Sequence, residues 1–321
     1  EDEIRELADL MQIPVITTMM GISVFPDDDQ LFCGMIGTHG VKMANAAVNE
    51  CDVLFLVGAR VGDRAVKTPL ALEKTTKIIH IDIDPAEIGK NIGADLPLVG
   101  DAKLVLQQMT ELAKPMKHDE WIAHIKTLGG ERKYVEPAKG TVNPRVFIDR
   151  LAKKMPANVT VVADVGQNQI WTCTEYKFRK EGRLLTSGGM GTMGYSVPAA
   201  IGAKMADDSR ATVAICGDGA FQMSFMELAT AVQFGVDIKV VVMTNNRLGM
   251  VRELQTNGYH DRQTAVFLDG SPDFIKLAEA YGIPAMRVYD DDTMEKGVEM
   301  LAEHKGICLV EVVVDKDMPT L

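Results

Sequence analysis

Two polar residues placed after two apolar runs are the best candidates for chemistry in this sequence. Asp218 stands in a Gly-Asp-Gly turn that follows the run 211–216, and Asn245 follows the run 238–243, 27 residues later. That interval fits one strand-helix-strand unit, with a helix expected over Ser224 to Gln233. Because a right-handed crossover brings the carboxyl ends of parallel strands to one edge of a sheet, we expect both side chains in one crevice.

The oxygen atoms in this crevice suit a magnesium ion. One carboxylate, one amide oxygen and one loop carbonyl form part of the octahedral oxygen shell that Mg²⁺ completes with water and phosphate oxygens. Gly217 and Gly219 allow the main chain to approach a diphosphate, and a helix starting after Phe221 favours its negative charge. The alternative is a plain strand, turn and helix with a solvated aspartate. The asparagine pair at crossover spacing favours the metal site.

The order of elements predicts an α/β protein with two doubly wound, parallel-sheet domains. Short apolar runs alternate with helical patterns, which is typical of parallel sheets covered on both faces. The expected strands are 15–18, 53–57, 78–83, 159–163, 211–216, 238–243 and 308–314. We predict a first domain over 1–130, a linker over 131–143 and a second domain over 144–321.

The stretch between the two predicted domains also carries helix signals. Trp121, Ile122 and Ile125 lie on one face of a possible amphipathic helix. Asn143 followed by Pro144 supplies an N-cap and a proline at the first helical position, which predicts the start of the second domain.

Composition excludes several classes of partner. The 321 residues are 46% hydrophobic and 25% charged, with a net charge of −11, which argues against nucleic acid or an anionic membrane as a partner. No apolar run approaches the roughly 18 residues that span a bilayer. The five cysteines form no CxxC pair and no zinc-like spacing, so we expect reduced thiols. With no signal or transit peptide at the start, we expect a cytoplasmic protein.

The metal-site motif resembles the signature of thiamine-diphosphate enzymes. The segment Asn245-Asn-Arg-Leu-Gly-Met-Val251 is similar to the form found in the acetolactate synthase family. This resemblance implies Asp218, Asn245 and the main-chain carbonyl of Arg247 as Mg²⁺ ligands. If the segment is aligned with the family motif on its asparagine pair instead, the Mg²⁺-binding asparagine is Asn246.

Two further segments resemble the same family. The run 187–202 (SGGMGTMGYSVPAAIG) is similar to the segment beneath the cofactor's rings, which implies that the Gly191 carbonyl accepts from the aminopyrimidine and that Met193 props the rings. The alternative is that these glycines belong to a loop that allows a helix to pack closely on the sheet and have no cofactor role. Val165-Gly-Gln-Asn168 resembles the family's Val-Gly-Gln-His, which touches the diphosphate, with Asn168 replacing histidine. The implied thiamine-diphosphate contacts are Gly166, Gln167, Asn168, Gly191, Met193, Asp218, Gly219, Ala220, Asn245, Leu248, Gly249 and Met250.

The first half shows no GxGxxG, but it places charges after expected strands. Arg60 and Asp63 follow one strand, and Asp82 and Asp84 lie in or just after the next, so either a nucleotide-like ligand or solvated loop charges fits. The run 80–91 (HIDIDPAEIGKN) is close to the FAD-carrying middle domain of acetolactate synthases. Gly62 stands where family members usually have an aspartate. The implied FAD contacts are Thr18, Met19, Gly37, Thr38, His39, Gly58, Arg60, Asp63, Arg64, Asp82, Ile83 and Asp101.

The resemblance implies decarboxylation of pyruvate and its ligation to a second 2-keto acid, giving acetolactate or acetohydroxybutyrate. It further implies a homodimer or tetramer, with a small regulatory subunit as a possible partner. Family members carry a preceding domain that supplies the activating glutamate, so we assign no catalytic residue here and expect the 321 residues alone to be inactive. Another carboligase or decarboxylase of this superfamily, or a non-catalytic cofactor-binding module, remain alternatives. Leu254 stands where many members have a channel tryptophan, which leaves substrate choice open.

Overall fold

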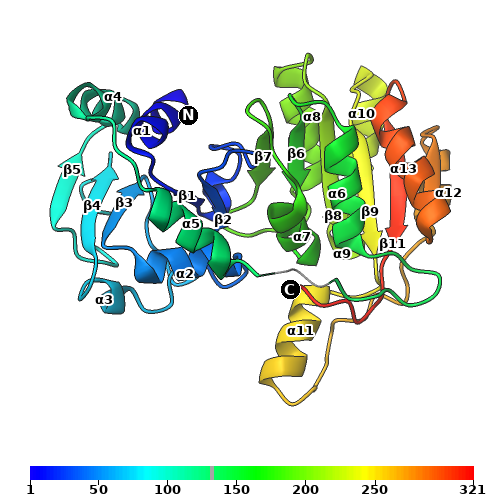
Figure 1. The fold of residues 1–321 in the computed structure, drawn as a ribbon. Coiled ribbons are helices and arrows are strands. Elements are labelled where there is room, and N and C mark those ends of the chain that lie inside the picture. The colour runs from blue at the N-terminus through cyan, green and yellow to red at the C-terminus, as the bar shows by residue number, and fades with distance from the viewer. Residues whose placement is uncertain (131–133) are drawn as a thin grey trace. The chain divides into compact units, whose positions relative to one another are not determined.

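The chain folds into two compact units, Glu1–Arg132 and Lys133–Leu321 (Figure 1). The structure is a computed structural model that describes residues 1–130 and 134–321. All the strand pairs in the described sheets are parallel, which confirms the α/β class. The predicted linker begins on residues 131–133, which lie outside the described residues.

The first unit contains two small parallel sheets, with strand orders β1-β2 and β3-β4-β5. Its strands are β1 (Val15–Thr17), β2 (Phe32–Met35), β3 (Val53–Val57), β4 (Lys77–Asp82) and β5 (Leu96–Val99). Its helices are α1 (Asp2–Met11), η1 (Met19–Gly21), α2 (Lys42–Glu50), α3 (Pro69–Leu72), α4 (Ala102–Leu112) and α5 (Asp119–Leu128).

Strand β4 is covered on both faces and contributes apolar side chains to both. Ile78 packs with Leu56 and Leu72 on one face. Ile81 packs with Leu7 of α1 and Leu106 of α4 on the other. Ile78 and Ile81 therefore point into two separate clusters, as expected for a buried parallel strand.

The amphipathic helix expected near Trp121 is α5, and it belongs to the first unit. Ile125 is buried in a cluster with Cys33 and Ala47, against which Trp121 also packs. The unit therefore extends through this helix.

The second unit is built on a six-stranded parallel sheet of order β10-β11-β9-β8-β6-β7. Its strands are β6 (Thr160–Ala163), β7 (Arg183–Thr186), β8 (Thr212–Gly217), β9 (Lys239–Thr244), β10 (Ala285–Val288) and β11 (Cys308–Val313). Its helices are α6 (Pro144–Lys154), α7 (Gln167–Glu175), α8 (Ser196–Ala206), α9 (Asp218–Gln222), η2 (Phe225–Glu227), α10 (Leu228–Phe234), α11 (Gly249–Gly258), α12 (Phe274–Ala280) and α13 (Asp291–Glu303).

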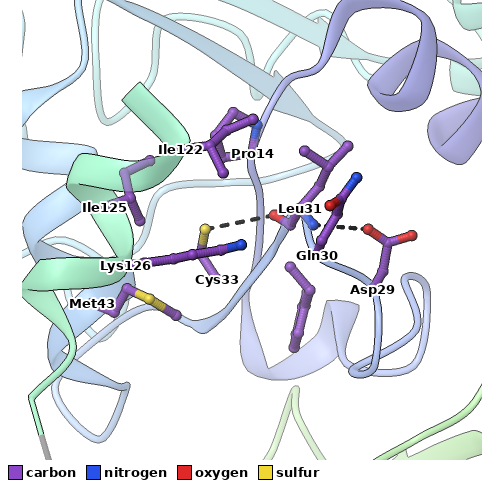
Figure 2. Close-up of a pocket in the computed structure, with 10 residues that line it drawn as sticks. Pro14, Asp29, Gln30, Leu31, Cys33, Met43, Ile122, Ile125 and Lys126 are labelled. Atoms are coloured by element: carbon purple, nitrogen blue, oxygen red, sulfur yellow. Dashed lines mark hydrogen bonds between the residues drawn. The ribbon is translucent and has the colours of Figure 1, made fainter. Parts of the chain in front are cut away.

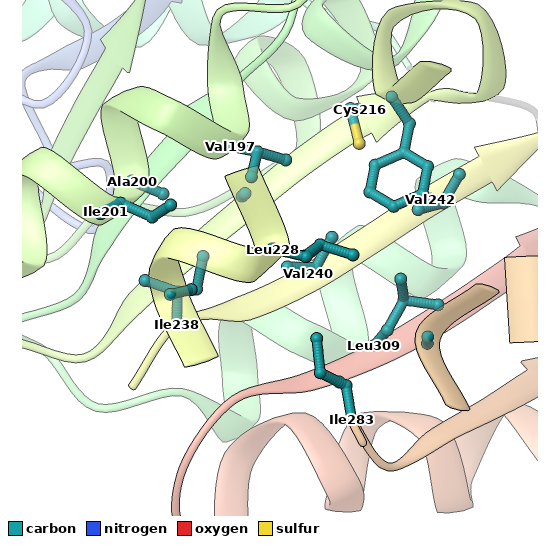
Figure 3. Close-up of a cluster of buried hydrophobic side chains, with 14 of the residues drawn as sticks. Val197, Ala200, Ile201, Cys216, Leu228, Ile238, Val240, Val242, Ile283 and Leu309 are labelled. Carbon is teal, nitrogen blue, oxygen red and sulfur yellow. The ribbon is translucent and has the colours of Figure 1, made fainter. Parts of the chain in front are cut away.

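Helices cover this sheet on both faces. Figure 3 shows one face, where Val240 and Val242 of β9 and Leu309 of β11 meet Val197 of α8 and Leu228 of α10. On the other face, α13 contacts β10, β11 and α6, and α6 contacts α7. The second unit is therefore a doubly wound α/β domain, as predicted.

The strand order places a ligand crevice between β6 and β8. The connection after β6 leads to β7 on one side, and the connection after β8 leads to β9 on the other. Open parallel sheets bind ligands where neighbouring strands lead in opposite directions, at their carboxyl ends. Asp164 and Asp218 directly follow these two strands.

The helix expected over Ser224 to Gln233 is broken into shorter pieces. Helix α9 already begins at Asp218, η2 follows Ser224, and α10 runs from Leu228 to Phe234. The prediction placed the helix start after Phe221, which was too late, because the glycines of the Gly-Asp-Gly turn were read as a loop.

Helix α6 begins as predicted. The Asn143 side chain accepts hydrogen bonds from the main-chain N–H groups of Arg145 (2.9 Å) and Val146 (3.4 Å), and Pro144 is the first helical residue. The Asn143 amide also donates to the Val135 carbonyl (2.9 Å), which ties part of the preceding segment to the second unit.

Candidate cofactor site

Asp218 is a buried carboxylate that holds together two strand ends. Its Oδ1 accepts from the N–H of Gly219 (2.8 Å), and its Oδ2 accepts from the N–H groups of Asn245 (3.2 Å) and Asn246 (2.6 Å). Burial raises the pKa of Asp218 to about 6, although these three N–H groups act to lower it. The predicted meeting of Asp218 and Asn245 is therefore present.

The two asparagines differ in what their side chains can do. The Asn245 Oδ1 accepts from the N–H of Arg247 (3.1 Å), and its amide nitrogen donates to Gln167 Oε1 (3.3 Å), which fixes the orientation of the side chain. Asn246 is exposed and has a positive φ of 54°, which asparagine adopts more readily than most residues. Asn245 is therefore the better oriented candidate ligand.

This donor set fits Mg²⁺ with a bound diphosphate. Among the described residues, no group of three or more His, Cys, Asp and Glu side chains is arranged to hold a metal ion. A single carboxylate with amide and main-chain oxygens leaves several positions for phosphate oxygens and water, as Mg²⁺ requires. The site would not suit zinc, which prefers nitrogen and sulfur ligands.

The predicted diphosphate-contact residues lie at the start of α7, on the β6 side of the crevice. Gly166 is the N-cap of α7 with φ 143°, and a side chain there would come within 2.8 Å of Asn168 Oδ1. Asn168 is buried, and its amide nitrogen donates to the carbonyls of Asp164 (2.8 Å) and Ile215 (3.2 Å). Because both hydrogens are used by the main chain, donation from Asn168 to a diphosphate would break one of these bonds.

Three of the predicted residues converge on one point. A side-chain carbon placed on Gly219 would lie 2.8 Å from Leu248 Cδ2 and 3.2 Å from Met193 Cε. The Gly-Asp-Gly turn, the start of α11 and the glycine-rich segment therefore meet there. Met193 also packs against the hydrophobic core.

Asp164 was not predicted, yet it organises the glycine-rich segment. This fully buried residue follows β6, and its carboxylate accepts from the N–H groups of Val165 (2.9 Å), Gly194 (3.0 Å) and Ser196 (2.8 Å). The signal was an aspartate directly after an apolar strand, next to Val165-Gly-Gln. Asp164 thus holds the segment against the crevice.

The remaining predicted residues of this site occupy different environments. Gly191 is exposed with φ 65°, and nothing lies within 4 Å of its missing side chain. Ala220 is buried in the core beside Phe221, and Met250 is half-buried in the first turn of α11. Leu254, the residue at the tryptophan position, is exposed on the same helix.

In the first unit, several predicted FAD contacts lie in neighbouring loops. The N–H of Thr38 donates to the Arg64 carbonyl (2.9 Å), and a side chain on Gly37 would clash with that carbonyl at 2.4 Å. The N–H of Gly58 donates to the carbonyl of Ile81 (2.8 Å). The loop after β2 is thereby joined to the loop after β3, and the start of the loop after β3 is joined to strand β4.

The charged members of this set face solvent, with one exception. Arg60, Asp63 and Arg64 are exposed, whereas Asp82 is buried and accepts from the N–H of Asp84 (3.0 Å). Asp101 caps helix α4 by accepting from the N–H of Leu104 (3.2 Å), so it has a structural role besides the predicted one. Thr18 precedes η1, which contains Met19; His39 is half-buried, and Ile83 is exposed.

A small cavity of about 160 Å³ lies elsewhere in the first unit (Figure 2). Leu31, Ile122 and Ile125 form its apolar walls, and the Cys33 thiol donates to the Leu31 carbonyl (3.6 Å). Burial raises the pKa of Cys33 to about 11, so this thiol is protonated at neutral pH. The other four cysteines are also free thiols with raised pKa values.

The fold and the site define the class of protein. Residues 1–109 match the central domain of thiamine pyrophosphate enzymes, and residues 164–312 match their C-terminal TPP binding domain. The chain therefore belongs to the thiamine pyrophosphate (thiamine diphosphate) enzyme family and carries these two domains. No described helix has the length and apolar character needed to cross a membrane.

Individual relatives point to one branch of this family. The chain is 40% identical over 98% of its length to a probable acetolactate synthase large subunit from Methanocaldococcus jannaschii. It is 39% identical to an acetolactate synthase from Arthrospira platensis and 36% identical to the large subunit from Lactococcus lactis, again over 98% of its length. The chain spans 55 to 56% of the length of these relatives.

Proposed function

We propose that this protein is the catalytic chain of an acetolactate synthase. The reaction is decarboxylation of pyruvate and ligation of its two-carbon fragment to a second 2-keto acid, giving 2-acetolactate or 2-aceto-2-hydroxybutyrate. The observation that carries the proposal is the convergence of Asp218 and Asn245 at two neighbouring strand ends. The identities of 36 to 40% with acetolactate synthases support this branch of the family.

In this proposal the second unit anchors and orients the cofactor. Asp218, the Asn245 Oδ1 and the main-chain carbonyl of Arg247 would hold Mg²⁺, and the start of α7 would lie beside the diphosphate. When bound, thiamine diphosphate supplies the electron sink for decarboxylation. Met193 and Leu248, which approach Gly219 together, would form an apolar wall that excludes water from the reacting centre.

We further propose that the first unit binds FAD. The support is the arrangement of the loops after β2 and β3, where main-chain hydrogen bonds join Thr38 to Arg64 and Gly58 to Ile81 of β4. The carboxyl ends of neighbouring parallel strands are the usual place for a nucleotide. Protein purified under mild conditions should be yellow and should release FAD on denaturation. Protein that neither retains nor takes up FAD would leave Arg60 and Asp63 as solvated surface charges.

The activity is tested by supplying pyruvate with Mg²⁺, thiamine diphosphate and FAD to the 321 residues joined to the preceding domain that the family resemblance implies; the 321 residues alone should give no product. We expect acetolactate from pyruvate alone and acetohydroxybutyrate when 2-ketobutyrate is added. Glyoxylate and an aryl 2-keto acid serve as alternative substrates. Ligation of glyoxylate, or release of a free aldehyde without ligation, would assign the protein to another branch of the family.

A further inference from the structure

Gln167 links the metal-site loop to the last residues of the chain. This buried side chain lies at the start of α7, and its Oε1 accepts from the Asn245 amide (3.3 Å). Its Nε2 lies within hydrogen-bond distance of the Met318 carbonyl (2.9 Å), Thr320 Oγ1 (3.1 Å) and Glu253 Oε2 (3.3 Å). The Gln167 amide is therefore surrounded by partners from the chain itself.

Glu253 and Thr320 close this network. The Glu253 carboxylate on α11 accepts from the N–H of Thr320 (3.1 Å) and from its hydroxyl group. Thr320 is 3% exposed, so this contact is shielded from water. Gly249 provides the space, because a side chain there would lie 1.9 Å from Gln167 Oε1.

We propose that Glu253 and Thr320 are positioning residues that orient the Mg²⁺ ligand Asn245 through Gln167. This inference rests on the proposed function of Asp218 and Asn245 as the metal site. Glu253 and Thr320 are not catalytic residues, because they act only through Gln167.

The physical reason is that an amide side chain has two ends of nearly equal shape but opposite hydrogen-bonding character. The two hydrogens of the Gln167 nitrogen face three acceptors, Glu253, Thr320 and the Met318 carbonyl, which retain the nitrogen end of Gln167 and direct its oxygen toward Asn245. That oxygen retains the nitrogen end of Asn245 and leaves its Oδ1 available to a metal ion. If Thr320 loses its hydroxyl group, Gln167 loses one acceptor and Glu253 also loses the hydroxyl donor that holds its carboxylate beside Gln167, so both amides are less strongly held in these orientations.

The test is the Mg²⁺ dependence of thiamine diphosphate binding to the apo-protein, followed by calorimetry. Outer partners of metal ligands typically contribute about 10- to 100-fold to metal affinity. For Thr320→Val we expect the half-saturating Mg²⁺ concentration to rise about tenfold, while cofactor affinity at saturating Mg²⁺ changes much less. Thr320→Ser should restore the parent value. Glu253→Ala removes the carboxylate partner of Thr320 and Gln167. It should therefore raise the half-saturating Mg²⁺ concentration as much as Thr320→Val does.

Asp317→Asn is the matched control. Asp317 lies in the same terminal segment and pairs with Arg252 (3.4 Å), but it has no bond to Gln167, Glu253 or Thr320. We expect its Mg²⁺ dependence to match the parent protein. The inference is wrong if Thr320→Val and Glu253→Ala have the same half-saturating Mg²⁺ concentration as the parent. It is also wrong if Asp317→Asn raises that concentration as much as these two variants do. If the parent itself shows no Mg²⁺-dependent binding, the proposed function fails instead.

Discussion

At the scale of single residues, the structure separates the two asparagines that follow β9. Asn245 contributes through its side chain, whereas Asn246 contributes its N–H to Asp218 and a left-handed main-chain conformation. We therefore expect Asn245→Ala to weaken Mg²⁺-dependent cofactor binding by at least tenfold, in line with losing a metal ligand or its orientation.

Asn246→Gly is the suitable comparison, because glycine tolerates the positive φ without strain. We expect calorimetric titration to show nearly unchanged Mg²⁺ binding for this variant. A larger loss for Asn246→Gly than for Asn245→Ala would move the ligand to Asn246. The variant Asp218→Ala is a less informative test of the metal site, because it also leaves three main-chain N–H groups without their acceptor.

The raised pKa of Asp218 gives the metal site a pH dependence. Its carboxyl group holds a proton up to about pH 6 rather than 3.8, so Mg²⁺ must displace that proton at lower pH. Below pH 6 we expect the apparent Mg²⁺ affinity to fall about tenfold per pH unit, with a plateau above. The folding stability of the metal-free protein has the opposite pH dependence. The stability contributed by the raised pKa of Asp218 is complete below pH 3.8 and is lost as the pH rises through 6.

Calorimetry in two buffers of different ionisation enthalpy measures the proton released on metal binding. We expect release at pH 6 and almost none at pH 8. Mg²⁺ and thiamine diphosphate titrated without protein in the same buffers give the background. Equal proton release at both pH values would show that Asp218 is not the titrating ligand.

At the scale of elements, two glycines inside helices of the second unit predict opposite effects on stability. A side-chain carbon on Gly297 of α13 would lie 2.6 Å from Val288 Cγ2 and 3.2 Å from Val310 Cγ1, where the helix packs on the sheet. Gly202 of α8 has nothing within 4 Å of that position. We expect Gly297→Ala to lower the free energy of unfolding by about 1–3 kcal/mol through overpacking.

For Gly202→Ala we expect a gain of about 0.5–1 kcal/mol, because alanine is the better helix former where no clash arises. Denaturant unfolding measures both. Destabilisation by both variants to the same extent would contradict the packing argument at Gly297. The open space at Gly202 also shows that this glycine of the 187–202 segment is not needed for close helix-sheet approach.

The sequence predicted the buried strands better than the edge strands. Strands β8 and β9 are entirely or almost entirely buried, so their apolar runs identified them. Strands β7 and β10 form the two edges of the sheet, are short, and are only partly buried. Their mixed sequences, Arg183–Thr186 and Ala285–Val288, carry no continuous apolar signal.

The candidate site was predictable where residue type alone identified the chemistry. The spacing of Asp218 and Asn245 anticipated their meeting, because a crossover fixes which strand ends are neighbours. Glu253 and Thr320 gave no such signal, since their contact joins segments 67 residues apart through side-chain orientation. Asp164 directly follows an apolar run, but its residue type and position fit a solvated residue at a strand end equally well.

At the scale of the whole molecule, the two units have separate hydrophobic cores, so each ligand should act mainly on its own unit. A ligand at 100 times its Kd stabilises the unit that binds it by about 2.7 kcal/mol. Hydrogen exchange followed by mass spectrometry reads this segment by segment. With Mg²⁺ and thiamine diphosphate we expect the strongest protection in peptides covering 164–168, 217–220 and 245–250. With FAD we expect it in peptides covering 37–39, 58–64 and 82–84.

Mg²⁺ without thiamine diphosphate is the control for the first ligand, and adenosine diphosphate is the control for FAD. Neither should give the full protection, because each lacks part of the proposed ligand. Protection by FAD confined to the second unit, or by thiamine diphosphate confined to the first, would contradict the assignment of cofactors to units. Protection from hydrogen exchange depends on the free energy of local opening. It would therefore reveal a cofactor bound to the other unit even in protein without measurable turnover.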